Sequence, residues 1–100
     1  MHAGPAVDEL LSCLEDRYTR QIMTTLQDGP MPARDIVASC DCSRPTVYRR
    51  LNDLETAGVV TTTMQCNPDG HHRKMFLLQV DQITLELQPD GIVAHTSQSR

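Results

Sequence analysis

The 100-residue sequence lacks the features that mark several broad classes of protein. No stretch approaches the roughly 18 consecutive apolar residues that a membrane-spanning helix requires. No basic segment followed by an apolar one stands at the N-terminus, so no secretory signal is visible. A Gly-rich phosphate loop, a nucleophile motif and a convincing acid–base pair are also missing. We therefore expect a cytoplasmic protein that is not an enzyme, has no membrane partner and needs no cofactor.

Lysine is nearly absent as well. The nine basic residues are eight arginines and Lys74, and the acidic residues are nine Asp and four Glu. This bias is typical of salt-loving archaea, and it predicts a halophilic archaeal source. The net charge of −4 at first argues against a nucleic-acid partner. However, residues 43–58 sum to +1 and residues 71–74 to +2, which leaves −7 for the remaining chain. A local basic face can bind nucleic acid on an otherwise acidic protein.

The segment 43–58 has the signals of a helix with defined ends. Ser43 is a good N-cap, because its hydroxyl can accept a hydrogen bond from the first turn. Pro45 fits the first turn, where no intrahelical N–H is needed. Gly58 can end the helix in the left-handed conformation. Taken alone, the segment fits an ordinary solvated helix equally well.

One narrow apolar stripe runs along this helix. Val47, Leu51 and Leu54 recur at i, i+4 and i+7, so only one edge of the helix is expected to be buried. The other positions carry side chains that suit phosphate oxygens and base edges. We predict that these residues contact DNA: Arg44, Thr46, Tyr48, Arg49 and Asn52 as readers of bases or phosphates, and Arg50 as a phosphate clamp.

The flanking segments complete a helix-turn-helix pattern. Apolar residues at helical spacing predict a helix over residues 7–27, with a break near residues 15–16, and residues 28–30 end it. Residues 32–39 predict a second, short helix with Pro32 in its first turn. A three-residue break at residues 40–42 then leads into the Ser43 cap.

After Gly58 the periodicity changes to two. Residues 59–64 and 75–80 predict a pair of strands around the turn signal at residues 67–70, which is the wing of a winged helix. Residues 83–88 and 92–96 predict a second hairpin. The expected fold is α+β, a winged helix-turn-helix with about four helices, a β-hairpin wing and a C-terminal β-hairpin. We expect one domain over residues 1–100, with residues 1–6 and 97–100 flexible.

At this point the chain resembles the ArsR-like winged helix-turn-helix family of transcription regulators, especially its small archaeal members. The resemblance runs from about Asp16 to Val80, roughly two-thirds of the chain. Three helical segments and the wing carry it: Asp16-Arg17-Tyr18-Thr19-Arg20-Gln21-Ile22; Ala33-Arg34-Asp35-Ile36-Val37; Ser43-Arg44-Pro45-Thr46-Val47-Tyr48-Arg49-Arg50-Leu51 with Leu54, Ala57, Gly58 and Val59; and Gly70 with Phe76 and Leu78. It implies a homodimer on double-stranded operator DNA, with the recognition helix in the major groove and the wing at the minor groove.

The expected function is therefore sequence-specific DNA binding in transcriptional regulation. On the wing, Arg73 and Lys74, helped by His71 and His72, are expected to grip the DNA backbone or minor groove. The rival interpretation is a winged-helix module that binds protein and no DNA, which the net charge of −4 favours slightly.

The four cysteines are expected to be reduced thiols, since no secretion signal accompanies them. Cys40 and Cys42 are two residues apart, and such thiolates can chelate a soft metal. The metal-sensing branch of the resembling family often carries Cys-x-Cys near the start of the first helix of the motif. Here the pair follows that helix, so the sensor role does not carry over by position. The favoured interpretation is that Cys40 packs as a small apolar residue and Cys42 is an incidental turn residue. A metal- or thiol-sensing repressor remains an alternative.

Two apolar stripes predict a homodimer. One is at residues 7–14 and the other is at residues 83–87, in the hairpin of residues 83–96. A small core can cover one of them well, and an uncovered patch of this kind typically marks an interface. We expect the helix of residues 7–14 to dominate the contact.

Overall fold

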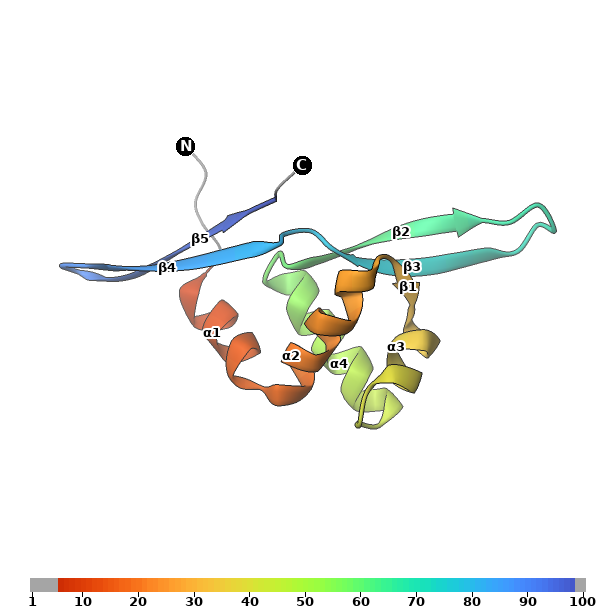
Figure 1. The fold of residues 1–100 in the computed structure, drawn as a ribbon, viewed down its shortest axis with the longest axis horizontal. Helices are drawn as coiled ribbons and strands as arrows, with labels where there is room; N and C mark the ends of the chain where they lie inside the picture. The colour runs from red at the N-terminus through yellow and green to blue at the C-terminus, as the bar shows by residue number, and fades with distance from the viewer. Residues whose placement is uncertain (1–5, 99–100) are drawn as a thin grey trace.

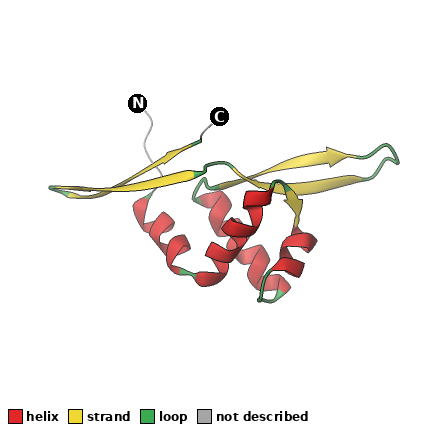
Figure 2. Ribbon diagram, in the orientation of Figure 1, coloured by secondary structure: helices red, strands yellow, loops and turns green. Residues whose placement is uncertain are grey.

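The computed structural model describes residues 6–98, and within this range the chain forms four α-helices followed by two β-hairpins (Figure 1). The helices gather on one side, and the hairpins project from them in opposite directions (Figure 2). This α+β arrangement confirms the predicted winged helix-turn-helix. None of the helices in the described range is both long enough and apolar enough to cross a membrane. The helical elements are α1 (Val7–Glu15), α2 (Arg17–Thr25), the 3-10 helix η1 (Leu26–Asp28), α3 (Ala33–Ser39) and α4 (Arg44–Thr56).

The predicted helix of residues 7–27 is broken at Asp16, as expected. Asp16 has an extended backbone and ends α1, and its side chain caps α2. Its Oδ2 accepts hydrogen bonds from the backbone N–H of Thr19 at 2.8 Å and from the Thr19 hydroxyl at 2.9 Å. The cap satisfies orphan donors of the first turn and fixes the angle between the two helices. Residues 1–5, expected to be flexible, lie outside the described residues.

Both ends of α4 follow the sequence signals. The Ser43 hydroxyl accepts from the backbone N–H of Thr46 at 3.3 Å. At the other end Gly58 has a φ of 78°, which an L side chain rarely adopts. The N–H of Val59 donates to the carbonyl of Leu54, and the N–H of Gly58 donates to that of Glu55, both at 3.0 Å. This pair of bonds is a Schellman motif, and it turns the chain directly into the wing.

The wing consists of β2 (Val60–Cys66) and β3 (His72–Leu78), paired antiparallel from Val60 opposite Leu78 to Cys66 opposite His72. The predicted second strand, Met75–Val80, is wrong at both ends. The apolar residues alone define the predicted limits, whereas the backbone ladder extends past them to His72 at the tip and ends earlier, at Leu78, at the base of the wing. Consequently three of the predicted wing-tip residues, His72, Arg73 and Lys74, lie within β3 rather than in the turn.

A short strand, β1 (Met31–Pro32), was not predicted. It pairs with the other side of β3, with Met31 opposite Phe76 and Pro32 opposite Met75. Pro32 is therefore the N-cap residue of α3, not a first-turn residue. Proline is tolerated there because this strand lies at the sheet edge, where a missing N–H does least harm. The pairing holds the start of α3 beside the wing.

Residues from every helix and both hairpins form one hydrophobic core. Leu10 of α1 is fully buried in it, and so is Leu54 of α4. The expectation that the stripe of residues 7–14 is offered to a second chain is therefore wrong for Leu10, because its own fold covers that side chain. Val7, Leu11 and Leu14 of the same helix are only partly buried.

The C-terminal hairpin leaves part of its apolar face uncovered. It consists of β4 (Gln82–Gln88) and β5 (Gly91–Ser97), with Leu87 opposite Ile92 and Leu85 opposite Ala94. Opposed residues share a face, so these four form one stripe. Ala94 is 2% exposed against the core, whereas Leu87, near the tip, is 83% exposed. Ser97, predicted to be frayed, closes β5, and residues 99–100 lie outside the described residues.

Candidate nucleic-acid interface

Helix α4, predicted to be the recognition helix, buries one edge and exposes the rest. Val47, Leu51 and Leu54 are at most 1% exposed, which confirms the predicted stripe. At 100° per residue, Arg49 lies nearly opposite that stripe, and its side chain is exposed. Asn52 is exposed on the flank of α4 that faces the wing. The outer surface of the helix is thus polar and cationic, as contact with DNA requires.

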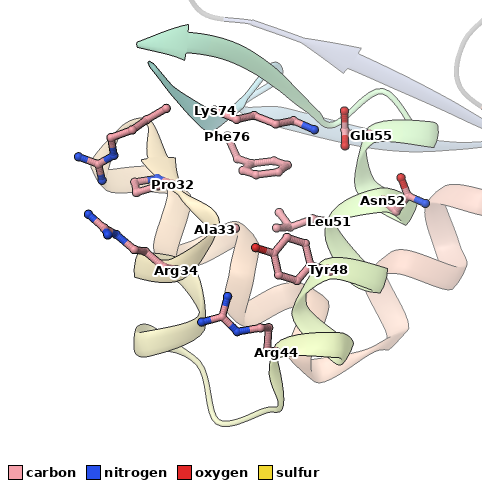
Figure 3. A pocket seen from close by; sticks show the side chains of 11 residues that line it. Pro32, Ala33, Arg34, Arg44, Tyr48, Leu51, Asn52, Glu55, Lys74 and Phe76 are labelled. Atoms are coloured by element: carbon pink, nitrogen blue, oxygen red, sulfur yellow. The ribbon is translucent and has the colours of Figure 1, made fainter. Parts of the chain in front are cut away.

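A groove of about 620 Å³ lies between α4, the start of α3 and strand β3 of the wing (Figure 3). Its floor and walls are largely apolar and its rim is charged. The lining residues are Pro32, Ala33, Arg34, Arg44, Tyr48, Leu51, Asn52, Glu55, Arg73, Lys74 and Phe76. Strand β3 therefore builds the groove together with two helices that precede the wing in the sequence.

The groove is strongly cationic. Four basic residues line it, against Glu55 as the acidic one. Among the residues the structure describes, Arg44, Arg73 and Lys74 have no ion-pair partner. Lys74 lies over the ring of Phe76, with Nζ 5.3 Å from the ring centroid, which is a cation–π contact. Cations without internal partners are available to an anion from outside.

The structure brings five of the predicted residues together around this groove: Arg44, Tyr48 and Asn52 from α4, and Arg73 and Lys74 from β3. Figure 3 shows the Tyr48 ring forming one wall, opposite Arg34 and Ala33. The Tyr48 side chain is 45% exposed, so its ring is accessible. The sequence pattern predicts the wing directly after this helix, whereas the place of both on DNA is implied by the resemblance to winged regulators.

The other five predicted residues, Arg50 among them, lie elsewhere. Arg49 lies outside the groove on the outer face of α4. Thr46 is half-buried, and its hydroxyl is 2.9 Å from that of Ser43, so it takes part in the helix cap. His71 ends the wing turn and His72 begins β3, and both are exposed without lining the groove.

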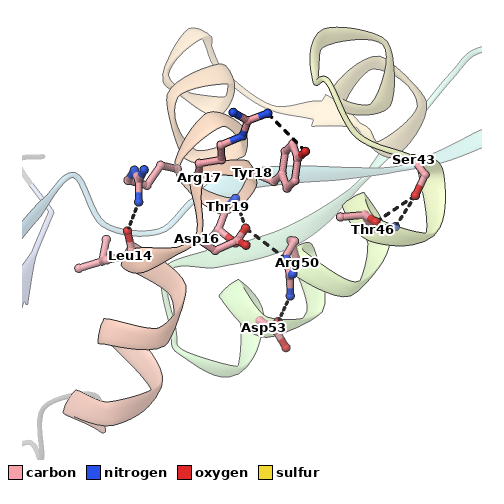
Figure 4. Close-up of polar contacts among 10 residues, drawn as sticks. Leu14, Asp16, Arg17, Tyr18, Thr19, Ser43, Thr46, Arg50 and Asp53 are labelled. Atoms are coloured by element: carbon pink, nitrogen blue, oxygen red, sulfur yellow. Dashed lines mark hydrogen bonds and ion pairs between the residues drawn. The ribbon is translucent and has the colours of Figure 1, made fainter.

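Arg50 is placed on the opposite flank of α4 and faces inward (Figure 4). Its Nε is 3.2 Å from Oδ2 of Asp16, and its Nη1 is 3.7 Å from Oδ2 of Asp53. The Nε–H does not point at the Asp16 oxygen, so this contact is an ion pair without a hydrogen bond. The structure thus puts Arg50 at the contact between α4 and α2 and outside the groove, although the sequence predicts it to be a phosphate clamp.

The environment of Asp16 fits this structural role. Its partial burial by itself would raise the pKa of the carboxyl. The hydrogen bonds from Thr19 and the nearby Arg50 guanidinium outweigh that effect, and the pKa lies below its ordinary value of 3.8. The carboxylate is therefore charged at neutral pH and holds α1, α2 and α4 together.

Two groove residues had not been singled out from the sequence, Arg34 and Glu55. Arg34 pairs only loosely with Asp35, at 4.0 Å, and both side chains are largely exposed. An exposed arginine at the start of the first helix of the motif was a visible signal. Its place beside the wing depends on the β1–β3 pairing, which joins residues more than forty positions apart.

The cysteine pair lies between α3 and α4. All four cysteines are free, and Cys40 and Cys42 are both partly buried. Burial raises the pKa of the Cys40 thiol, and the neighbouring Cys42 raises it further. Burial likewise raises the pKa of the Cys13 thiol in the core. Within residues 6–98, no three His, Cys, Asp or Glu side chains are grouped as a metal site would need.

Comparison with known families agrees with this geometry. A family model described as a helix-turn-helix domain matches residues 14–63, which is half of the chain. The match begins at the end of α1 and reaches into β2, so it includes α3, α4 and the turn between them. No curated protein sequence matches the chain. The chain therefore belongs to the family of helix-turn-helix domains, a DNA-binding class typical of transcription regulators.

Proposed function

We propose that this protein is a sequence-specific, ArsR-like winged regulator of transcription that binds duplex DNA as a homodimer. The observation that supports it most is the row of unpaired cations, Arg44, Arg73 and Lys74, held beside the exposed face of α4. Such side chains neutralise phosphates and release counterions. Helix-turn-helix domains are typically not enzymes, and we propose no catalytic activity for this chain.

In this proposal α4 and the wing have different roles in DNA binding. Arg49 on the outer face of α4 and Asn52 on the flank that faces the wing would read base edges, where arginine pairs with guanine and asparagine with adenine. Arg73 and Lys74 on the wing would contact the DNA backbone, and such phosphate contacts position a protein but carry no sequence information. In this proposal Arg50 holds α4 against the other helices through Asp16 and does not contact DNA.

The test begins with a preferred duplex selected from a random pool, followed by binding titrations over a series of salt concentrations. Arg49→Ala should cost about 1–3 kcal/mol on the preferred duplex and relax the preference at one base position. Arg73→Ala and Lys74→Ala should weaken the preferred and a scrambled duplex about equally and lower the salt slope. Arg20→Ala, on α2 outside the groove, is the matched control. Binding that depends neither on salt nor on these residues would refute the proposal.

The homodimer is proposed to form through the C-terminal hairpin. Leu85, Leu87 and Ile92 are 43%, 83% and 42% exposed and share one face near its tip. A hairpin of two strands is only marginally stable by itself, so a partner on this face would stabilise it. We place the contact on residues 83–96, with the partly buried residues of α1 at its margin, in contrast to the expectation that α1 dominates.

Two alternatives remain as proposals. The net charge of −4 favours a winged module that binds protein instead of DNA, and the salt titration separates it from the regulator. A metal- or thiol-sensing repressor would use Cys40 and Cys42. The raised pKa of Cys40 weighs against that role, since thiolates bind metals and react with oxidants. The halophilic archaeal source stays a prediction from composition.

A further inference from the structure

We propose that the groove between α4 and the wing binds a small organic anion with an apolar body, such as an aromatic carboxylate, and that this anion competes with DNA. Binding of the anion to the groove does not depend on the proposed function. Only the competition rests on the proposed function.

The floor is apolar and continuous with the core. Leu51, Phe76 and Ala33 are 1%, 4% and 8% exposed, so they close the bottom of the groove and leave little accessible area of their own, and Lys74 lies over the Phe76 ring. The Tyr48 ring adds an accessible aromatic wall. The volume of about 620 Å³ falls within the range of small-molecule sites, which are mostly apolar with a few convergent polar groups. An aromatic or aliphatic body thus has a surface to bury.

The rim determines the charge of the ligand. Arg34, Arg44, Arg73 and Lys74 surround the floor from three elements, against Glu55 alone. Arginine matches the planar geometry of a carboxylate and can donate two parallel hydrogen bonds to it. A neutral molecule of the same shape would leave these donors without a partner, and a cation would be repelled.

A duplex would use only part of this site. Its phosphates need the cations of the rim and can use the Tyr48 hydroxyl, whereas the Phe76 ring and the Leu51 side chain offer nothing to a phosphate oxygen. Contact with the DNA backbone therefore does not use the apolar floor, which suits a ligand with an apolar body. Because the anion would take up the same guanidinium and ammonium groups, its binding and DNA binding should oppose each other.

The first experiment titrates sodium 1-naphthoate into the full chain at constant ionic strength and follows amide and aromatic NMR signals. The neutral 1-naphthalenemethanol tests the charge, and acetate tests the apolar body. We expect saturable shifts centred on Tyr48, Phe76 and Lys74, with both comparison compounds binding at least about tenfold more weakly. Equal binding of naphthoate and the neutral alcohol, or shifts centred on the exposed hairpin residue Leu87, would overturn the proposal.

Variants then test the assigned residues. Arg73→Gln and Arg44→Gln should each weaken naphthoate binding about tenfold while the remaining NMR spectrum stays that of a folded chain, as expected for the loss of a charge-assisted hydrogen bond. Arg17→Gln is the matched control, because Arg17 stacks on Tyr18 outside the groove. An equal effect of Arg17→Gln would show that only general charge matters and would refute the site.

The last measurement adds the selected duplex. Naphthoate should displace it, and the apparent DNA affinity should fall in proportion to occupancy of the groove. If the anion binds as described and no duplex binds at all, the ligand site stands and the proposed function fails. If the duplex binds and naphthoate does not, the present inference fails and the function stands. Simultaneous binding of both would refute the competition.

Discussion

Leu10 and Leu87 should respond to truncation in opposite ways. Leu10 is fully buried in the core, whereas Leu87 is 83% exposed on the hairpin. Truncating a buried leucine to alanine loses the transfer free energy of the removed atoms and leaves a cavity. The free energy of unfolding then falls by about 2.7–5 kcal/mol. For a domain of this size each kcal/mol lowers the Tm by roughly 4–8 °C. Leu10→Ala should therefore lower the Tm by on the order of 10–40 °C.

Leu87→Ala should change the stability of the isolated chain by less than about 0.5 kcal/mol, since the side chain is mostly in solvent. If the hairpin forms the homodimer, this variant should nevertheless raise the dimer dissociation constant at least about tenfold. Thermal unfolding at several protein concentrations, with sedimentation equilibrium beside it, measures both effects, because a dimer makes the Tm depend on concentration. A dimer that Leu87→Ala leaves intact, or a Leu10→Ala variant with an unchanged Tm, would refute this reasoning.

Three further predictions follow from the contacts of α4 and its neighbours. Arg44→Ala should lower the salt slope of DNA binding, whereas Arg50→Ala should leave the slope unchanged and lower the urea midpoint; the reverse pattern would reassign both residues. Because the pKa of Asp16 is lowered by folding, its contribution is complete above about pH 3.8 and is lost as the pH falls below that value. Urea midpoints measured from about pH 5 to pH 2.5 should thus fall less steeply in Asp16→Asn than in the parent. The double variant Cys40→Ser with Cys42→Ser should fold and bind DNA as the parent does; stoichiometric zinc on the parent, lost in this variant, would favour the sensor instead.

Helix ends and apolar stripes could be predicted from the sequence, because they depend on residues close together along the chain. The Ser43 cap, the stripe of Val47, Leu51 and Leu54, and the end of α4 at Gly58 all depend on contacts within a few residues. The break at residue 16 is of the same kind, because Asp16 caps a helix that begins at the next position. Residues 14–63, which the helix-turn-helix family model matches, include all of these local signals.

Which side of each helix or strand meets its neighbours depends on tertiary packing. Helical spacing puts Arg44 and Arg50 on different flanks of α4, but only the fold shows that one flank faces the wing and the other faces Asp16. Strand β1, at Met31–Pro32, has almost no local signal and forms because β3 offers it a free edge.

The two apolar stripes were equally visible in the sequence, and packing alone decides which of them the core buries. The core covers Leu10 and leaves Leu87 in solvent, because α1 lies against α2 and α4 while the hairpin tip extends beyond the helices (Figure 1). Periodicity identifies the apolar side of an element, but which sides meet depends on long-range contacts. That physical difference separates what was predictable here from what required the folded chain.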